Sequence, residues 1–130
     1  MSKALDCINV LVVDDQDCLV DLLSDIVEGL GFSSEVAHDG QEALEKFQGG
    51  NFQMVITDIK MPRMDGIQLT KMVKRDRPDV PVIAITGFGN EEAGEDLRSE
   101  QMDGFLEKPF RIAKIEGMIC EVLRGYNLIY

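Results

Sequence analysis

Apolar runs and helically spaced apolar residues alternate along this chain. A strand buried on both faces gives a short continuous apolar run, whereas a helix lying on a sheet gives apolar residues every three to four positions. Apolar runs predict strands at residues 8–13, 33–37, 52–57, 80–85 and 104–107. Helical spacing follows each run, in the stretches 19–30, 39–50, 65–77, 90–101 and 112–125. Five strand–helix alternations predict an α/β domain in which right-handed crossovers place helices on both faces of a parallel sheet.

The helix boundaries carry recognisable signals, and one helix is weak. Asp39 and Asp65 stand where a side-chain oxygen can cap the second and third helices. The fourth helix, at 90–101, has few apolar anchors, and Gly94 in its interior costs about 1 kcal/mol relative to alanine. We therefore expect the fourth helix to be the most loosely held of the five.

The length of 130 residues fits a single domain. We place this domain at 1–130, with a structured core at about 6–125 and a tail at 126–130. The tail is apolar and holds both tyrosines. It can pack back on the last helix, dock a partner, or begin a linker to another domain; packing is the simplest interpretation.

Charge and hydropathy exclude several classes of protein. Charged residues make up 28% of the chain, no apolar run approaches 18 residues, and the first residues lack the apolar segment of a signal peptide. We therefore expect a cytoplasmic protein that does not insert in a membrane. The net charge of −11 also opposes direct binding to nucleic acid or to anionic membranes. Cys7, Cys18 and Cys120 lack metal-ligand spacing and are expected to be buried or half-buried reduced thiols.

Acids stand at the carboxyl ends of two predicted strands. Asp14 and Asp15 follow the first strand, and Asp58 follows the third. Ligands of open α/β sheets bind at this edge, so we expect the three carboxylates to converge. Two carboxylates about 4 Å apart repel by about 4 kcal/mol at an effective dielectric of 20, so the cluster stays ionised only beside a cation. Oxygen donors without cysteine or histidine favour Mg²⁺, or Mn²⁺, over zinc.

Two further residues suit phosphoryl chemistry at the same edge. Lys108, after the fifth strand, offers a positive charge for phosphoryl oxygens, and Thr86, at the end of the fourth strand, offers a hydroxyl donor. An aspartate beside Mg²⁺ can act as a nucleophile on a phosphoryl donor. The chain has no P-loop, which argues against a nucleotide triphosphatase. His38 is expected to be a surface residue and not a phosphate carrier.

Four segments together resemble the receiver domains of two-component response regulators. They are VVDD at 12–15, DIKMPRMDG at 58–66, ITG at 85–87 and LEKPF at 106–110. Each segment is weak alone, but all four occur in order at strand ends, and the resemblance covers essentially the whole chain. It implies a flavodoxin-like, doubly wound, five-stranded parallel sheet of order 2-1-3-4-5 with five helices, whose switch point lies between the first and third strands.

The resemblance also implies roles for individual residues. Asp58 would be the phosphoacceptor. Asp15 would bind Mg²⁺ directly, Asp14 partly through water, and the backbone carbonyl of Lys60 would be a further ligand alongside Asp58. Lys108 would contact the phosphoryl group and pair with Asp58 before phosphorylation.

Three more positions follow from the same resemblance. Thr86 would turn toward the phosphoryl group. Phe105 stands where the family has an aromatic switch residue that moves between outward and inward rotamers, although an aromatic on a short strand can equally be a core residue. The bond that precedes Pro109 would be cis.

The resemblance implies a phosphorelay module that is not an enzyme in the ordinary sense. Asp58 would accept a phosphoryl group from a sensor histidine kinase or a histidine phosphotransfer protein, with Mg²⁺-dependent self-phosphorylation and self-dephosphorylation only. The switch would alter the face made by 90–101, 104–107 and 112–125, which would bind a downstream partner, a fused output domain or a second copy as a dimer. Alternatives are a phosphotransfer intermediate or phosphate sink, or a Mg²⁺-dependent phosphohydrolase, which Lys60 disfavours because that class has an acid there.

Overall fold

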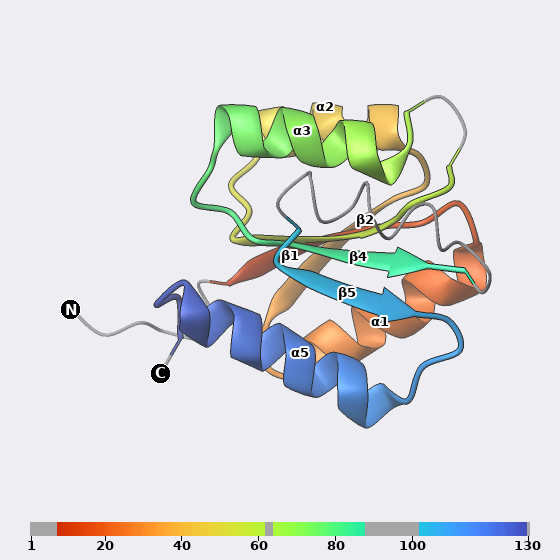
Figure 1. Ribbon diagram of the computed structural model, residues 1–130, viewed down its shortest axis with the longest axis vertical. Coiled ribbons are helices and arrows are strands. Elements are labelled where there is room, and N and C mark those ends of the chain that lie inside the picture. The colour runs from red at the N-terminus through yellow and green to blue at the C-terminus, as the bar shows by residue number, and fades with distance from the viewer. Residues whose placement is uncertain (1–7, 62–63, 88–101, 130) are drawn as a thin grey trace.

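The computed structural model describes residues 8–61, 64–87 and 102–129, which form one layered α/β unit (Figure 1). Its sheet has five strands, with β2 and β5 at the two edges and the order β2-β1-β3-β4-β5. Every neighbouring pair is parallel. The strands are β1 (Asn9–Val13), β2 (Ser33–Ala37), β3 (Met54–Asp58), β4 (Val82–Thr86) and β5 (Gly104–Glu107). This confirms the predicted flavodoxin-like fold and strand order.

Helices cover both faces of the sheet. In Figure 1, α2 and α3 lie above the sheet, and α1 and α5 lie below it. The four helices of the described residues are α1 (Asp17–Gly29), α2 (Gly40–Gly49), α3 (Gly66–Asp76) and α5 (Ile112–Gly125). The expected fourth helix, 90–101, lies outside the described residues. The predicted caps are present, since Asp39 accepts from the Glu42 N–H and Asp65 from the Gln68 N–H, each at 2.8 Å.

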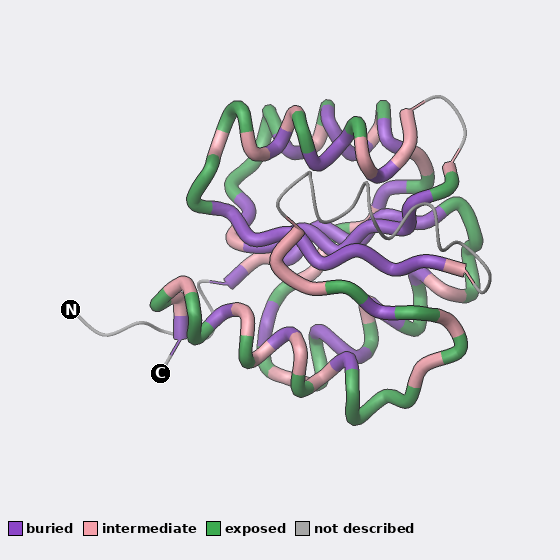
Figure 2. Tube along the Cα trace, in the orientation of Figure 1, coloured by how far each residue is buried: buried purple, intermediate pink, exposed green. Residues whose placement is uncertain are grey.

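The two larger apolar cores of the described residues lie on the two faces of the sheet. Side chains alternate along a strand, so neighbouring residues of β1 enter different cores. Val10 and Val12 pack in the core under α1 and α5, whereas Leu11 and Val13 pack in the core under α2 and α3. β3 and β4 are buried at every position, as the central purple strands of Figure 2 show. This continuous burial explains why the strands read as apolar runs and not as alternating patterns.

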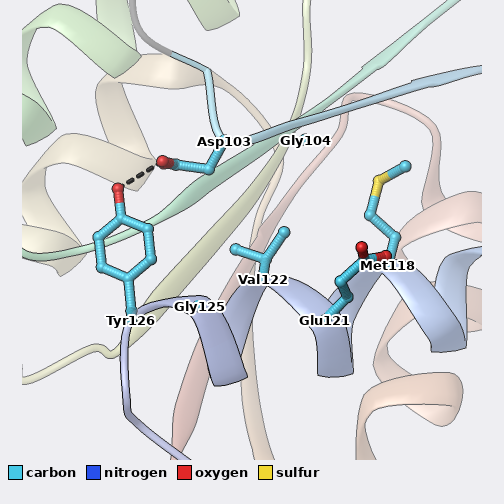
Figure 3. Close-up of a pocket in the computed structure, with 7 residues that line it drawn as sticks. All are labelled: Asp103, Gly104, Met118, Glu121, Val122, Gly125 and Tyr126. Carbon is cyan, nitrogen blue, oxygen red and sulfur yellow. Dashed lines mark hydrogen bonds between the residues drawn. The ribbon is translucent and has the colours of Figure 1, made fainter.

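The residues after α5 pack back on the domain. The Tyr126 hydroxyl donates a hydrogen bond to Asp103, the residue just before β5 (Figure 3). The Lys74 ammonium lies 2.7 Å from Asp103 Oδ2 and 3.1 Å from the Tyr126 hydroxyl. Beside this network, a cavity of about 470 Å³ opens between β5 and α5, next to Met118. Ile129 is buried in the core under α1 and α5, so the tail residues 126–129 belong to the packed domain.

Cys18 corrects one expectation, because it is exposed near the start of α1 and not buried. Cys120 is half-buried as expected, and Cys7 lies outside the described residues. Among the described residues, no helix is both long enough and apolar enough to cross a membrane.

Candidate functional site

Asp14, Asp15 and Asp58 come together at the carboxyl edge of the sheet. β1 pairs with β3 in parallel, with Val13 opposite Thr57, so the residues that follow these two leave the sheet side by side. One carboxylate oxygen from each acid lies within 4.8 Å of the other two. Asp14 and Asp58 are buried, whereas Asp15 is exposed. The cluster therefore combines two buried carboxylates with one that solvent reaches.

Lys108 lies between the two buried acids. Its Nζ is 3.5 Å from Asp14 Oδ2 and 3.6 Å from Asp58 Oδ2. The Lys108 backbone N–H donates to the Thr86 carbonyl at 2.8 Å, which ties the residue to the end of β4. The peptide bond from Lys108 to Pro109 is cis. A single ammonium group thus faces two carboxylates, which leaves the three-acid cluster with an excess of negative charge.

Burial dominates the ionisation of the two buried acids. It raises the pKa of the Asp14 carboxyl from 3.8 to about 6; the Gln16 N–H opposes this rise and the charge of Asp58 adds to it. Burial also raises the pKa of Asp58, which the Lys108 ammonium and the Ile59 N–H partly reverse. Both shifts mean that the charged forms are poorly solvated. A cation among these oxygens would stabilise the charged forms.

The donor set fits a small divalent cation. All three side-chain donors are carboxylate oxygens, and one of them, from Asp15, is exposed, so a bound ion could keep part of its water shell. Mg²⁺ prefers this combination of few carboxylates and several waters. Lys60, two residues after Asp58, is exposed. That its backbone carbonyl binds the metal ion stays a prediction.

The backbone around Asp58 presents its carboxylate. The Ile59 N–H donates to Asp58 Oδ1 at 2.8 Å, so Oδ2 is the oxygen that faces Lys108. The β3–α3 loop returns against the same residue at Gly66, where a Cβ atom would lie 2.2 Å from the Asp58 carbonyl oxygen. Only a residue without a side chain allows this approach. The sequence analysis did not predict this contact, although the Asp65-Gly66 pair at the start of a predicted helix is the pattern that could have indicated it.

Thr86 and Phe105 lie on the strands next to the acids. Asp58 is opposite Ile85, so Thr86 ends β4 one residue beyond it, and its side chain is buried. Phe105, on the edge strand β5, is 42% exposed. The core interpretation of Phe105 is therefore wrong for this structure. Its role as a switch stays a prediction.

His38, which we expected to be an ordinary surface residue, contacts two acids. Its Nε2 lies 3.2 Å from Asp17 Oδ1 at the start of α1, and its Nδ1 lies 3.5 Å from Glu42 Oε1 on α2. The side chain of His38 is about half exposed. Sequence reasoning missed these contacts, because they depend on how two separate loops lie beside each other.

The fold and the acid cluster define a class of protein. A doubly wound sheet of order 2-1-3-4-5 with clustered aspartates at its switch point and a lysine on the last strand's loop is the architecture of a receiver-type α/β domain. The family model of the response regulator receiver domain matches residues 10–120. This chain belongs to the response regulator receiver domain family.

Similar proteins occur in several kinds of organism. The osmosensing histidine protein kinase SLN1 of Saccharomyces cerevisiae is 31% identical over 127 residues, which are 92% of this chain and 10% of SLN1. The transcriptional regulatory protein FixJ of Bradyrhizobium diazoefficiens is 30% identical, over 89% of this chain and 57% of FixJ. A CheY-like receiver domain protein from Methanospirillum hungatei has a TM-score of 0.88 and 27% identity, covering 95% of this chain and 98% of its own. The chain thus spans about half or less of the length of many curated relatives.

Proposed function

We propose that this domain accepts a phosphoryl group on Asp58 in a Mg²⁺-dependent reaction and thereby switches a partner-binding surface. The observation that carries the proposal is the cluster of Asp14, Asp15 and Asp58, whose oxygens lie within 4.8 Å of one another, with Lys108 3.6 Å from Asp58. Receiver domains are regulatory modules and not enzymes in the ordinary sense. Turnover of small phosphate esters would instead indicate a phosphohydrolase.

Asp58 Oδ2 is the oxygen suited to attack. Oδ1 is engaged by the Ile59 N–H, whereas Oδ2 faces the ammonium of Lys108. As Oδ2 forms its bond to phosphorus, the bond from phosphorus to the donor atom breaks, and the donor leaves with that electron pair. Mg²⁺ held by Asp14, Asp15, Asp58 and the Lys60 carbonyl would neutralise charge on the phosphoryl oxygens. The chain's own contribution is to hold the acceptor in place and to keep Lys108 beside it.

The new phosphoryl group would act through charge. It adds roughly −1.5 to −2 charges at Asp58, which Lys108 and the Thr86 hydroxyl would bind. Movement of Thr86 would vacate space beside β5, which Phe105 would occupy from its present exposed position. The result is a shift of population between two packings of the surface that includes β5 and α5. The helix expected at 90–101 belongs to the same proposal.

The partners follow from the same chemistry. The phosphoryl donor would be a sensor histidine kinase or a histidine phosphotransfer protein in the cytoplasm. The partner that binds the switched surface would be a downstream protein, a second copy of this chain or an output domain. Relatives named as a histidine kinase and as a transcriptional regulator support these classes of partner. The net charge of −11 opposes direct contact with nucleic acid. A phosphate sink that returns its phosphoryl group to a histidine is the second candidate.

Phosphorylation by acetyl phosphate tests the proposal. The wild-type protein should gain the mass of one phosphoryl group when Mg²⁺ is present and none in EDTA. Asp58→Asn should gain none. Asp65→Asn is the matched control, because it changes an acid in the following loop while asparagine can still cap α3, and it should be phosphorylated normally. A gain of phosphoryl mass by Asp58→Asn, or by wild type without a divalent cation, would contradict the assignment of Asp58 as the Mg²⁺-dependent phosphoacceptor.

A further inference from the structure

The end of β2 and the turn that follows it contact both ends of the loop that carries Asp14 and Asp15. At its start, the Asp14 N–H donates to the Ala37 carbonyl at 3.1 Å. At its end, Asp17 Oδ1 lies 3.2 Å from His38 Nε2. Ala37 and His38 are consecutive residues. The last residue of β2 and the residue that follows it therefore contact the residues at the two ends of the short acid-bearing loop.

His38 is itself oriented by α2. Its backbone N–H donates to Glu42 Oε1 at 2.7 Å, and its Nδ1 lies 3.5 Å from the same oxygen. The backbone hydrogen bond from His38 lowers the pKa of Glu42, so this carboxylate is ionised at neutral pH. Lys46 lies 3.7 Å from the other Glu42 oxygen. The imidazole is thus placed between an acid of α2 and an acid of α1.

We propose that His38 is a positioning residue for the metal site. It acts through Asp17 to hold the loop in the geometry in which Asp14 and Asp15 bind a divalent cation. The proposal rests on the proposed function. Asp15 is exposed. Without the tether at Asp17, the loop that carries Asp15 would be more mobile before the ion binds. Ordering this loop on binding would then cost more conformational entropy, which weakens Mg²⁺ binding.

A purely electrostatic role for His38 would have the opposite effect, which makes the proposal testable. If His38 acted only by repelling the divalent cation, its removal would tighten Mg²⁺ binding. A tether predicts that its removal weakens Mg²⁺ binding. The direction of the change separates the two explanations.

The experiment measures Mg²⁺ affinity by calorimetry and the melting temperature for each variant of the whole chain. His38→Ala should bind Mg²⁺ about 1.5- to 5-fold more weakly than wild type, the range expected for an exposed ion pair. Asp17→Ala should weaken binding similarly, and the double variant should be no weaker than either single variant, because both remove one contact. His38→Arg, which restores a donor for Asp17, should recover part of the affinity despite its positive charge.

The matched control is Arg77→Ala. Arg77 makes an exposed ion pair with Asp79 at the same distance, 3.2 Å. This pair lies in the connection between α3 and β4, at the amino ends of the strands and so away from the acid cluster. It should leave Mg²⁺ affinity unchanged. An additional readout uses the single histidine of the chain, whose ring signals in NMR are those of His38 and should shift when Mg²⁺ binds.

Equal or tighter Mg²⁺ binding by His38→Ala would overturn the proposal, as would additive effects in the double variant or no recovery in His38→Arg. A fall in melting temperature with unchanged Mg²⁺ affinity would assign His38 a purely structural role and would also overturn it. Failure of the proposed function is distinct, because then the wild-type protein itself would show neither Mg²⁺ binding nor phosphorylation.

Discussion

Replacement of Asp14 by asparagine should stabilise the metal-free protein at neutral to alkaline pH. Asp14 is fully buried, and its carboxylate lies in the acid cluster with Asp15 and Asp58. Burial raises its pKa from 3.8 to about 6. Above this value the folded protein must hold a poorly solvated charge, whereas the unfolded chain exposes the same charge to water. Asparagine has nearly the same shape and no charge.

The magnitude follows from the shift in pKa. Between pH 3.8 and about 6 the folded state binds the Asp14 proton more tightly than the unfolded state, so stability falls as the pH rises through this window. A shift of about two units corresponds to about 3 kcal/mol. The substitution also removes the Lys108 contact at 3.5 Å, which offsets part of the gain. We expect Asp14→Asn to be more stable than wild type by about 1–2 kcal/mol at about pH 8.

Urea unfolding followed by circular dichroism measures this difference, since the chain has no tryptophan. In EDTA the gain in stability of Asp14→Asn over wild type should be present at about pH 8. It should be absent at about pH 4, where position 14 is neutral in the folded wild type as it is in the variant. Added Mg²⁺ should stabilise wild type more than the variant. Asp79→Asn is the control with opposite sign, because Arg77 lowers the pKa of Asp79 and the substitution removes a favourable contact. A variant less stable than wild type in EDTA at alkaline pH would refute the reasoning, as would a gain that does not change with pH.

Three further substitutions test packing around the site. Gly66→Ala places a Cβ 2.2 Å from the Asp58 carbonyl oxygen and should cost about 2–3 kcal/mol in urea unfolding, whereas Gly49→Ala, with no atom nearby, should be neutral or slightly stabilising; equal effects would contradict the contact. Tyr126→Phe should cost about 1–2 kcal/mol of unfolding free energy by removing hydrogen bonds to its two polar partners, and an unchanged denaturation midpoint would exclude that network. Ile119→Ala should cost about 2–5 kcal/mol, and a cost under 1 kcal/mol would contradict its complete burial.

The fold and the position of the acids could be predicted because both depend on local pattern. Continuous apolar runs mark strands buried on both faces, and the ends of parallel strands meet at one edge whatever the details of packing. Asp14 and Asp58 therefore converge as expected, and Lys108 lies beside them. The roles assigned to these side chains in phosphoryl transfer stay predictions.

Contacts between loops could not be predicted in the same way. His38 contacts Asp17 only because the β1–α1 loop and the β2–α2 turn lie side by side, and no spacing in the chain encodes that proximity. The exposure of Phe105 depends on which face of the edge strand is covered, and that of Cys18 depends on the rotation of α1. Sequence patterns determine where an element lies in the fold more reliably than which way a single side chain points.

The ionisation of the acid cluster supports the proposed role of this site as a switch. Raised pKa values at Asp14 and Asp58 mean that the metal-free, unphosphorylated state contains charges that the fold solvates poorly. A bound cation would relieve part of this instability, and a phosphoryl group on Asp58 would give Lys108 a new anionic partner in place of a carboxylate 3.6 Å away. Because burial disfavours the charged forms of these acids, a local change of charge at this edge would shift the balance between the two proposed packings. In this proposal, the stability that is lost by burying these charges is what makes the domain responsive.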